Sequence, residues 1–159
     1  MKRLVLTFTI LLGLSAPAWA GFNEGVAAYE RGDYATALRE FRPLAEQGAA
    51  AAQNNLGVMY KKGQGVPQDY ASAVKWYRKA AKQGYALALN NLGTMYGNGQ
   101  GVPQDYVQAH VWFNLAASRL PPGKDRDDSV ENRDIVAEKM TPADVSKAQR
   151  LAREWKPKK

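Results

Sequence analysis

The stretch GQGVPQDY at residues 63–70 decides the fold, because it returns letter for letter at residues 99–106. The repetition extends well beyond these letters, since residues 50–85 and 86–121 align without a gap and are identical at 20 of 36 positions. A fixed period of this length is typical of stacked helical units, each of which buries its apolar face only against its neighbours. The chain is therefore expected to be an array of repeats.

Each repeat predicts two helices joined by the quoted stretch. Apolar side chains recur at helical spacing in both halves of the first full repeat; they are Ala52, Leu56, Met59 and Tyr60, then Ala73, Trp76, Tyr77, Ala80 and Ala81. Gly63 suits the left-handed end of a helix, Pro67 cannot continue that helix, and Asp69 can cap the next one. A phosphate-binding loop would need a Gly-Lys-Ser/Thr ending, which is absent. We therefore interpret GQGVPQDY as an interhelical connector.

Two glycines inside predicted helices indicate close packing. Gly57 returns as Gly93 one repeat later, although glycine costs ~1 kcal/mol relative to alanine within a helix. We expect each to let the paired helix of its own repeat approach closely.

The repeated motifs L-G-x-M-Y, G-x-G-V-P-x-D-Y, A-x-x-W and A-A resemble the Sel-one-like repeat (SLR) family, close kin of tetratricopeptide repeats. The resemblance is complete over residues 50–117, partial over 22–48 and faint over 127–155. It implies an all-α, right-handed α-solenoid of about four helical hairpins, and a general role as an adaptor or scaffold. The expected parts are a hairpin at 21–48, full repeats at 49–84 and 85–120, a link at 121–126, a capping hairpin at 127–156 and a basic tail at 157–159.

The capping hairpin contains a helix-start motif and apolar residues that could cover the end of the array. Thr141, Pro142 and Asp144 form a typical helix start, and Leu151 and Trp155 are expected to cover the last open apolar face.

The N-terminus has the pattern of a secretory signal peptide at residues 1–20. Lys2 and Arg3 precede an apolar run at residues 4–14, and Ala18-Trp19-Ala20 is a small-x-small cleavage site. As a helix the run would rise only ~16 Å, about half of a ~30 Å hydrocarbon core. We therefore expect cleavage after Ala20, a periplasmic or secreted protein, and no integral membrane span afterwards.

The absence of cysteine excludes disulfides, iron–sulfur clusters and lipid anchoring through cysteine. Ser72 and Lys75 match the S-x-x-K of penicillin-binding enzymes, but the S-D-N and K-T-G motifs that such enzymes need are missing. A β-lactamase-type enzyme is thus the weakest alternative. His110 is the only histidine, and we expect a solvated or partly packed side chain there. No catalytic residue, cofactor or metal is predicted, nor a nucleic-acid site.

The expected function is non-catalytic binding of a protein or peptide on the concave wall formed by the first helices. One helix position faces away from the core stripe in successive units and carries an asparagine each time. The predicted contact residues are Asn23, Asn54, Val58, Lys61, Asn90 and Thr94. The formal charge of +7 leaves weak, charge-driven contact with acidic envelope polymers or lipid head groups as a second alternative.

Overall fold

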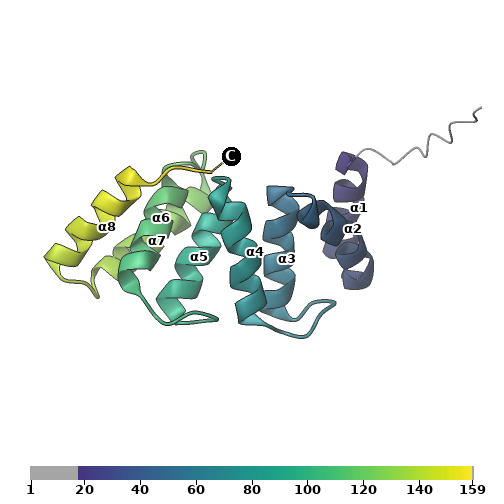
Figure 1. Ribbon diagram of the computed structural model, residues 1–159, viewed down its shortest axis with the longest axis horizontal. Coiled ribbons are helices and arrows are strands. Elements are labelled where there is room, and N and C mark those ends of the chain that lie inside the picture. The colour runs from purple at the N-terminus through teal and green to yellow at the C-terminus, as the bar shows by residue number, and fades with distance from the viewer. Residues whose placement is uncertain (1–17, 159) are drawn as a thin grey trace, which may run out of the picture.

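The computed structural model describes residues 18–158, which form eight α-helices and no strand. The helices form an elongated array with α1 and α2 at one end and α8 at the other (Figure 1). Their bounds are α1 Ala18–Glu30, α2 Tyr34–Glu46, α3 Ala50–Lys62, α4 Tyr70–Lys82, α5 Ala86–Asn98, α6 Tyr106–Ala117, α7 Lys124–Ala137 and α8 Pro142–Glu154. The prediction of an all-α solenoid is confirmed.

Three successive pairs pack as antiparallel hairpins, and the second helix of each contacts the first helix of the next. The last pair differs, because α7 and α8 both pack on α6 and contact each other little. Helix α7 begins at Lys124, inside the expected link at 121–126, so that only residues 118–123 separate α6 from α7. The acidic side chains of the first turn, Asp125 and Asp127, favour this early start because they face the positive end of the helix.

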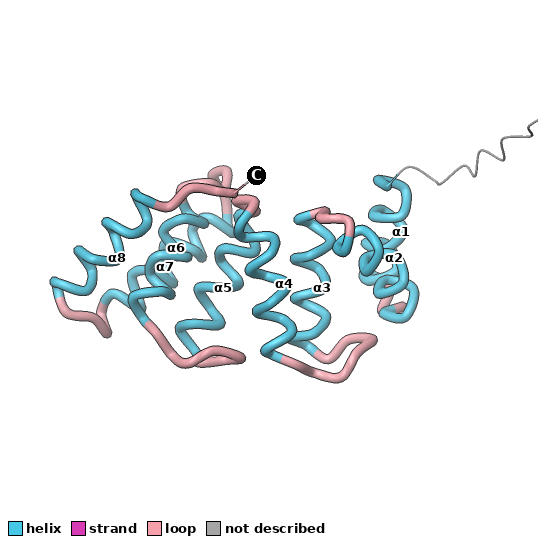
Figure 2. The backbone as a smooth tube through the Cα atoms, viewed as in Figure 1, coloured by secondary structure: helices cyan, strands magenta, loops and turns pink. Residues whose placement is uncertain are grey.

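Both copies of GQGVPQDY are connectors, as predicted, and form long loops along the same edge of the array (Figure 2). Gly63 ends α3 with a left-handed φ of 68°, and its N–H group donates to the Met59 carbonyl. The Asp69 carboxylate begins α4 by accepting a hydrogen bond from the Ser72 N–H group at 3.1 Å. The second repeat uses Gly99 and Asp105 in the same way.

The connector also contacts the preceding hairpin, which the sequence did not indicate. A Cβ atom at Gly65 would lie 2.8 Å from the Tyr34 carbonyl oxygen, so only glycine allows this approach. Beside it, Gln64 accepts a hydrogen bond from the Tyr29 hydroxyl at 2.7 Å and donates one to the Tyr34 hydroxyl at 2.8 Å. The connector therefore joins neighbouring repeats as well as neighbouring helices.

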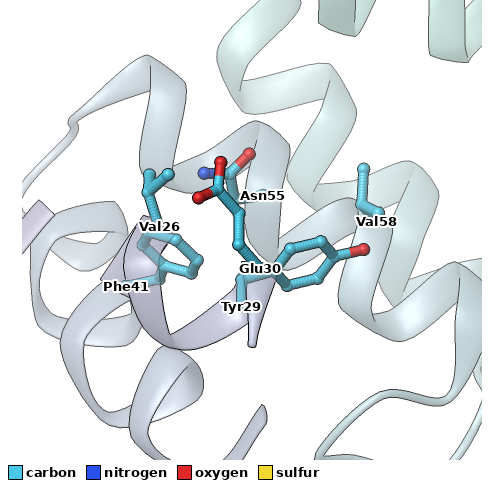
Figure 3. A pocket seen from close by; sticks show the side chains of 6 residues that line it. All are labelled: Val26, Tyr29, Glu30, Phe41, Asn55 and Val58. Carbon is cyan, nitrogen blue, oxygen red and sulfur yellow. The ribbon is translucent and has the colours of Figure 1, made fainter. Parts of the chain in front are cut away.

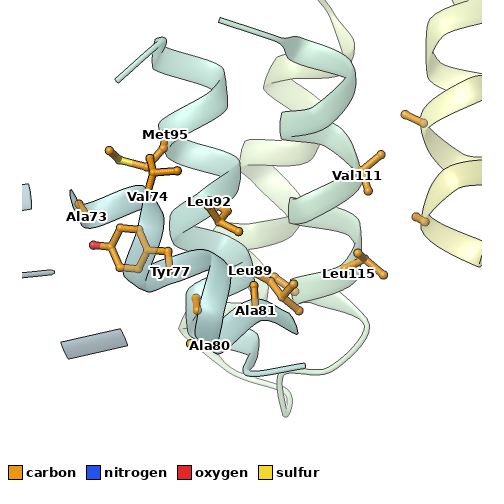
Figure 4. Packing of buried hydrophobic residues seen from close by; sticks show 14 residues of the cluster. Ala73, Val74, Tyr77, Ala80, Ala81, Leu89, Leu92, Met95, Val111 and Leu115 are labelled. Carbon is orange, nitrogen blue, oxygen red and sulfur yellow. The ribbon is translucent and has the colours of Figure 1, made fainter. Parts of the chain in front are cut away.

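The core is built from large rings packed against helix glycines, as the internal glycines predicted. A Cβ atom at Gly57 would lie 2.5 Å from Cδ1 of Tyr77, and one at Gly93 would lie 2.6 Å from the Phe113 ring. Tyr77 is completely buried within a cluster that includes Leu89 and runs from α4 to α8 (Figure 4). The absent side chains let the two helices of a hairpin approach until ring and backbone touch.

The C-terminal helix closes the array as expected. The Thr141 hydroxyl accepts a hydrogen bond from the Asp144 N–H group at 3.2 Å, and Pro142 occupies the first turn. The Trp155 ring lies edge-on to Trp112, with centroids 6.4 Å apart. This contact covers apolar surface on α6.

The expected signal peptide lies mostly outside the described residues. Helix α1 includes the predicted cleavage position after Ala20. Within residues 18–158, no helix has the length and apolar character that crossing a bilayer would require.

Candidate binding surface

The first helices of the repeats, α1, α3 and α5, form the surface on which sequence analysis placed a binding row. We call it the first-helix face. It does not carry all of the predicted asparagines. Asn54 is only 5% exposed, and its Oδ1 accepts a hydrogen bond from Nδ2 of Asn91 at 3.0 Å. The expectation that Asn54 faces away from the interior is wrong, because its side chain is buried and bonded to Asn91 of the next repeat.

Asn90 is also engaged in contacts between helices. Its Oδ1 accepts a hydrogen bond from the buried Ser129 hydroxyl at 3.1 Å, which links α5 to α7. Asn54 and Asn90 thus join successive elements of the array.

The other predicted residues keep some access to solvent. Asn23 is exposed, and Val58, Lys61 and Thr94 are half-buried. Partial burial lowers the pKa of the Lys61 ammonium, with a smaller contribution from neighbouring Lys62. The Thr94 hydroxyl donates to the Asn90 carbonyl in its own helix at 3.3 Å. Among these four, Val58 and Thr94 line pockets.

A pocket of about 360 Å³ opens on the first-helix face between α1 and α3. We call it the α1–α3 pocket; its lining comes from three helices and is shown in Figure 3. The lining residues are Val26, Tyr29 and Glu30 of α1, Phe41 of α2, and Asn55 and Val58 of α3. Sequence analysis identified Val58 alone; Asn55 was missed, although it stands next to Asn54 in the repeated Asn-Asn pair.

The pocket combines an apolar wall with two polar groups. The Tyr29 ring is held in place by its hydrogen bond to Gln64 and by edge-on packing against Tyr34, with centroids 5.5 Å apart. Glu30 is exposed and has no ion-pair partner among residues 18–158, whereas adjacent Arg31 pairs with Glu24 at 2.9 Å. The carboxylate of Glu30 and the amide of Asn55 therefore remain available at an otherwise apolar site.

A smaller pocket of about 210 Å³ lies between α5, α6 and α7. Thr94 and Phe113 line it, together with Ile135 of α7, which is 45% exposed. Phe113 and Phe41 stand two repeat periods apart in sequence, so the two pockets occupy related places in the array.

The structure gives no catalytic arrangement to the residues that suggested an enzyme. The Ser72 hydroxyl donates to the Asp69 carboxylate at 2.6 Å as part of the helix cap, while Lys75 is exposed. His110 is only 3% exposed, which corrects the expectation of a solvated or partly packed side chain. Burial lowers its pKa, and the positive charge of Arg133 lowers it further. Residues 18–158 contain no group of three or more metal-ligating side chains of the His, Cys, Asp and Glu types.

The repeat geometry agrees with a family comparison, in which the model for the Sel1 repeat matches residues 50–85 and 86–119. Residues 50–119 belong to the Sel1 repeat family. The resemblance stated from the repeated motifs is thereby confirmed. A comparison with curated proteins gave no significant match.

Two solved Sel1-type structures have the same fold. The first is c5321, described as a protective antigen of uropathogenic Escherichia coli with an SLR fold; it is 35% identical, with a TM-score of 0.80 over 87% of this chain and 30% of that one. The second is a Sel1 repeat protein from Oxalobacter formigenes, 28% identical, with a TM-score of 0.67 over 84% of this chain and 55% of that one. The chain thus spans about a third to a half of the length of these relatives.

Proposed function

We propose that this Sel1-repeat protein is an adaptor that binds a peptide segment of a partner protein on the first-helix face. Sel1 repeats are typical of scaffolds for protein interactions, which supports an adaptor role in general. The observation that carries the specific proposal is the α1–α3 pocket, because it is apolar, lies on the first-helix face and is bordered by unpaired polar groups.

The pocket suits one apolar side chain of an extended segment. Val26, Tyr29 and Val58 supply apolar contact area, and the Tyr29 ring is already fixed by Gln64, so little side-chain freedom is lost on binding. The Asn55 amide both donates and accepts, as pairing with a peptide backbone requires. Glu30 favours a basic residue next to the apolar one.

The proposed setting is the periplasm or the secreted space. The charged, apolar and small-x-small order of residues 1–20 supports export. Intact-mass analysis of protein recovered from the cell envelope tests this directly. We expect a chain that begins at Gly21, and a chain still beginning at Met1 would contradict export with cleavage after Ala20.

The binding face is tested with a charge placed inside the pocket. Val58→Asp puts a carboxylate among apolar side chains and should abolish capture of a partner from periplasmic extract. The matched control is Ala71→Asp, an exposed position on α4 outside the pocket. Partner capture by wild type and control but not by Val58→Asp would support the proposal, whereas equal capture by all three would refute it.

Charge-driven binding to acidic envelope polymers is distinguished by salt. Lys156 and Lys158, both exposed near the C-terminus, would carry such binding, and raising ionic strength should then weaken it steeply. Docking in an apolar pocket should change little over the same range.

A further inference from the structure

A third pocket lies toward the C-terminal end of the array and is separate from the proposed peptide site. Its volume is about 420 Å³, and it opens where α7 and α8 both pack on α6 without packing closely on each other. We call it the α6–α8 pocket. It is lined by His110 and Asn114 of α6, Arg133, Asp134 and Ala137 of α7, and Val145, Gln149 and Arg153 of α8.

His110 stands where the preceding repeat has a core residue. Val74, one period earlier, is 2% exposed and packs in the main apolar cluster. The imidazole of His110 is equally buried, yet its Nδ1 has no hydrogen-bond partner within the described chain. A buried polar atom without a partner costs free energy, so a histidine at this apolar position needs a reason beyond packing.

The charges around the histidine are predominantly positive. Arg133 pairs with neighbouring Asp134, with Nη2 and Oδ1 2.7 Å apart. Arg153 has no ion-pair partner among residues 18–158 and contributes a second guanidinium to the lining. Two guanidinium groups against one carboxylate leave the pocket with one uncompensated positive charge.

We propose that the α6–α8 pocket binds a carboxylate group. An arginine side chain presents two parallel N–H groups that match the two oxygens of a carboxylate. The amides of Asn114 and Gln149 can donate further hydrogen bonds to the same anion, and the imidazole of His110 forms the buried floor. The carboxylate belongs either to a small polycarboxylic acid or to an acidic side chain of a partner segment.

The test uses the imidazole as its reporter, because the chain contains a single histidine. The untagged protein is titrated with citrate, with the peptide acetyl-Glu-Glu-Glu-amide, or with its neutral glutamine counterpart, at constant pH and ionic strength. The ring carbon–proton resonances of His110 are followed by NMR. We expect a saturable shift with at least one of the two acidic probes and none with the glutamine peptide.

Variants of α8 separate binding in the pocket from general attraction to a basic protein. Arg153→Gln should weaken binding roughly tenfold, the effect of removing one charge-assisted contact. Arg150→Gln removes the same charge from an exposed site on the same helix outside the pocket and should change affinity less than about twofold.

The outcomes decide both the proposal and the ligand source. A shift with citrate alone identifies a small acid, and a shift with the glutamate peptide alone identifies an acidic protein segment. If neither probe moves the resonances, or if both arginine variants weaken binding equally, the pocket is not a carboxylate site. The proposed peptide site on the first-helix face is unaffected by either result.

Discussion

Replacing Gly57 by alanine tests the packing on which the array depends. The new Cβ atom would lie 2.5 Å from Cδ1 and 3.0 Å from Cζ of Tyr77, whereas ordinary contact begins near 3.4 Å. Tyr77 is completely buried, so its ring cannot yield by moving into solvent. Overpacking of a closed core costs ~1–3 kcal/mol, and the better helix propensity of alanine returns ~1 kcal/mol. We expect a net loss of up to ~2 kcal/mol in the free energy of unfolding.

Gly97 provides the matched control in α5. A Cβ atom there would meet Ala109 at 3.7 Å and Val136 at 3.8 Å, both ordinary contacts. Gly97→Ala should therefore keep the propensity gain and stabilise the protein by up to ~1 kcal/mol. Urea unfolding measures both changes, and a loss of ~1.5 kcal/mol should lower the melting temperature by roughly 5 °C for a domain of this size.

A double-mutant cycle assigns the loss to the ring. In a Tyr77→Leu background the steric conflict is removed, so Gly57→Ala should become neutral or stabilising. If Gly57→Ala stabilises the wild-type protein as much as Gly97→Ala does, the close-packing argument is refuted. A loss that persists unchanged in the Tyr77→Leu background would equally rule out the ring as its cause.

Three further changes test other parts of the structure. Asn54→Ala removes a buried hydrogen bond between repeats and should cost ~1 kcal/mol in urea unfolding, whereas Asn55→Ala should leave stability nearly unchanged; equal effects would contradict the assigned burial. Gly65→Ala needs a left-handed φ of 70° and places a Cβ atom 2.8 Å from the Tyr34 carbonyl oxygen, so thermal melts should show a loss of ~2 kcal/mol or more. Because burial lowers the folded-state pKa of His110 below its unfolded value of ~6.5, the unfolded chain binds more protons below that pH, and stability should fall as the pH drops from ~6.5 toward the lowered pKa. Substituting His110 by valine should flatten unfolding curves measured across this pH window.

Much of the fold was predictable because the same signals for helix starts and helix ends occur in both repeats. Glycine, proline and aspartate at fixed offsets marked the ends and starts of helices, and the structure has them in those roles at residues 63–69 and 99–105. The last pair was less predictable. Helix α7 begins within a charged stretch with few apolar residues, and its separation from α8 depends on how both pack on α6.

The predicted row of contact residues was only partly correct. Helical periodicity gives the face of the helix on which a side chain lies, but it does not show which other helix contacts that face. Asn54 and Asn55 are adjacent in sequence, yet the first is buried and bonded to Asn91 of α5, while the second lines a pocket. Likewise, sequence analysis placed His110 on a helix face but did not show that this face lies between α7 and α8. Such differences arise from contacts between repeats. The sequence period does not show which residues make these contacts.

Each connector contacts the hairpin that precedes it, and this makes the two ends of the array different. Gly65 packs against the backbone of α2 and Gly101 against that of α4, so each connector contacts the hairpin that precedes it. Gln64 likewise finds both of its tyrosine partners in the first hairpin. Removal of the first hairpin would leave the connector after α3 without its contact on α2, whereas removal of α7 and α8 would leave the contacts of both connectors intact. Shortening of such an array is therefore not equivalent at its two ends.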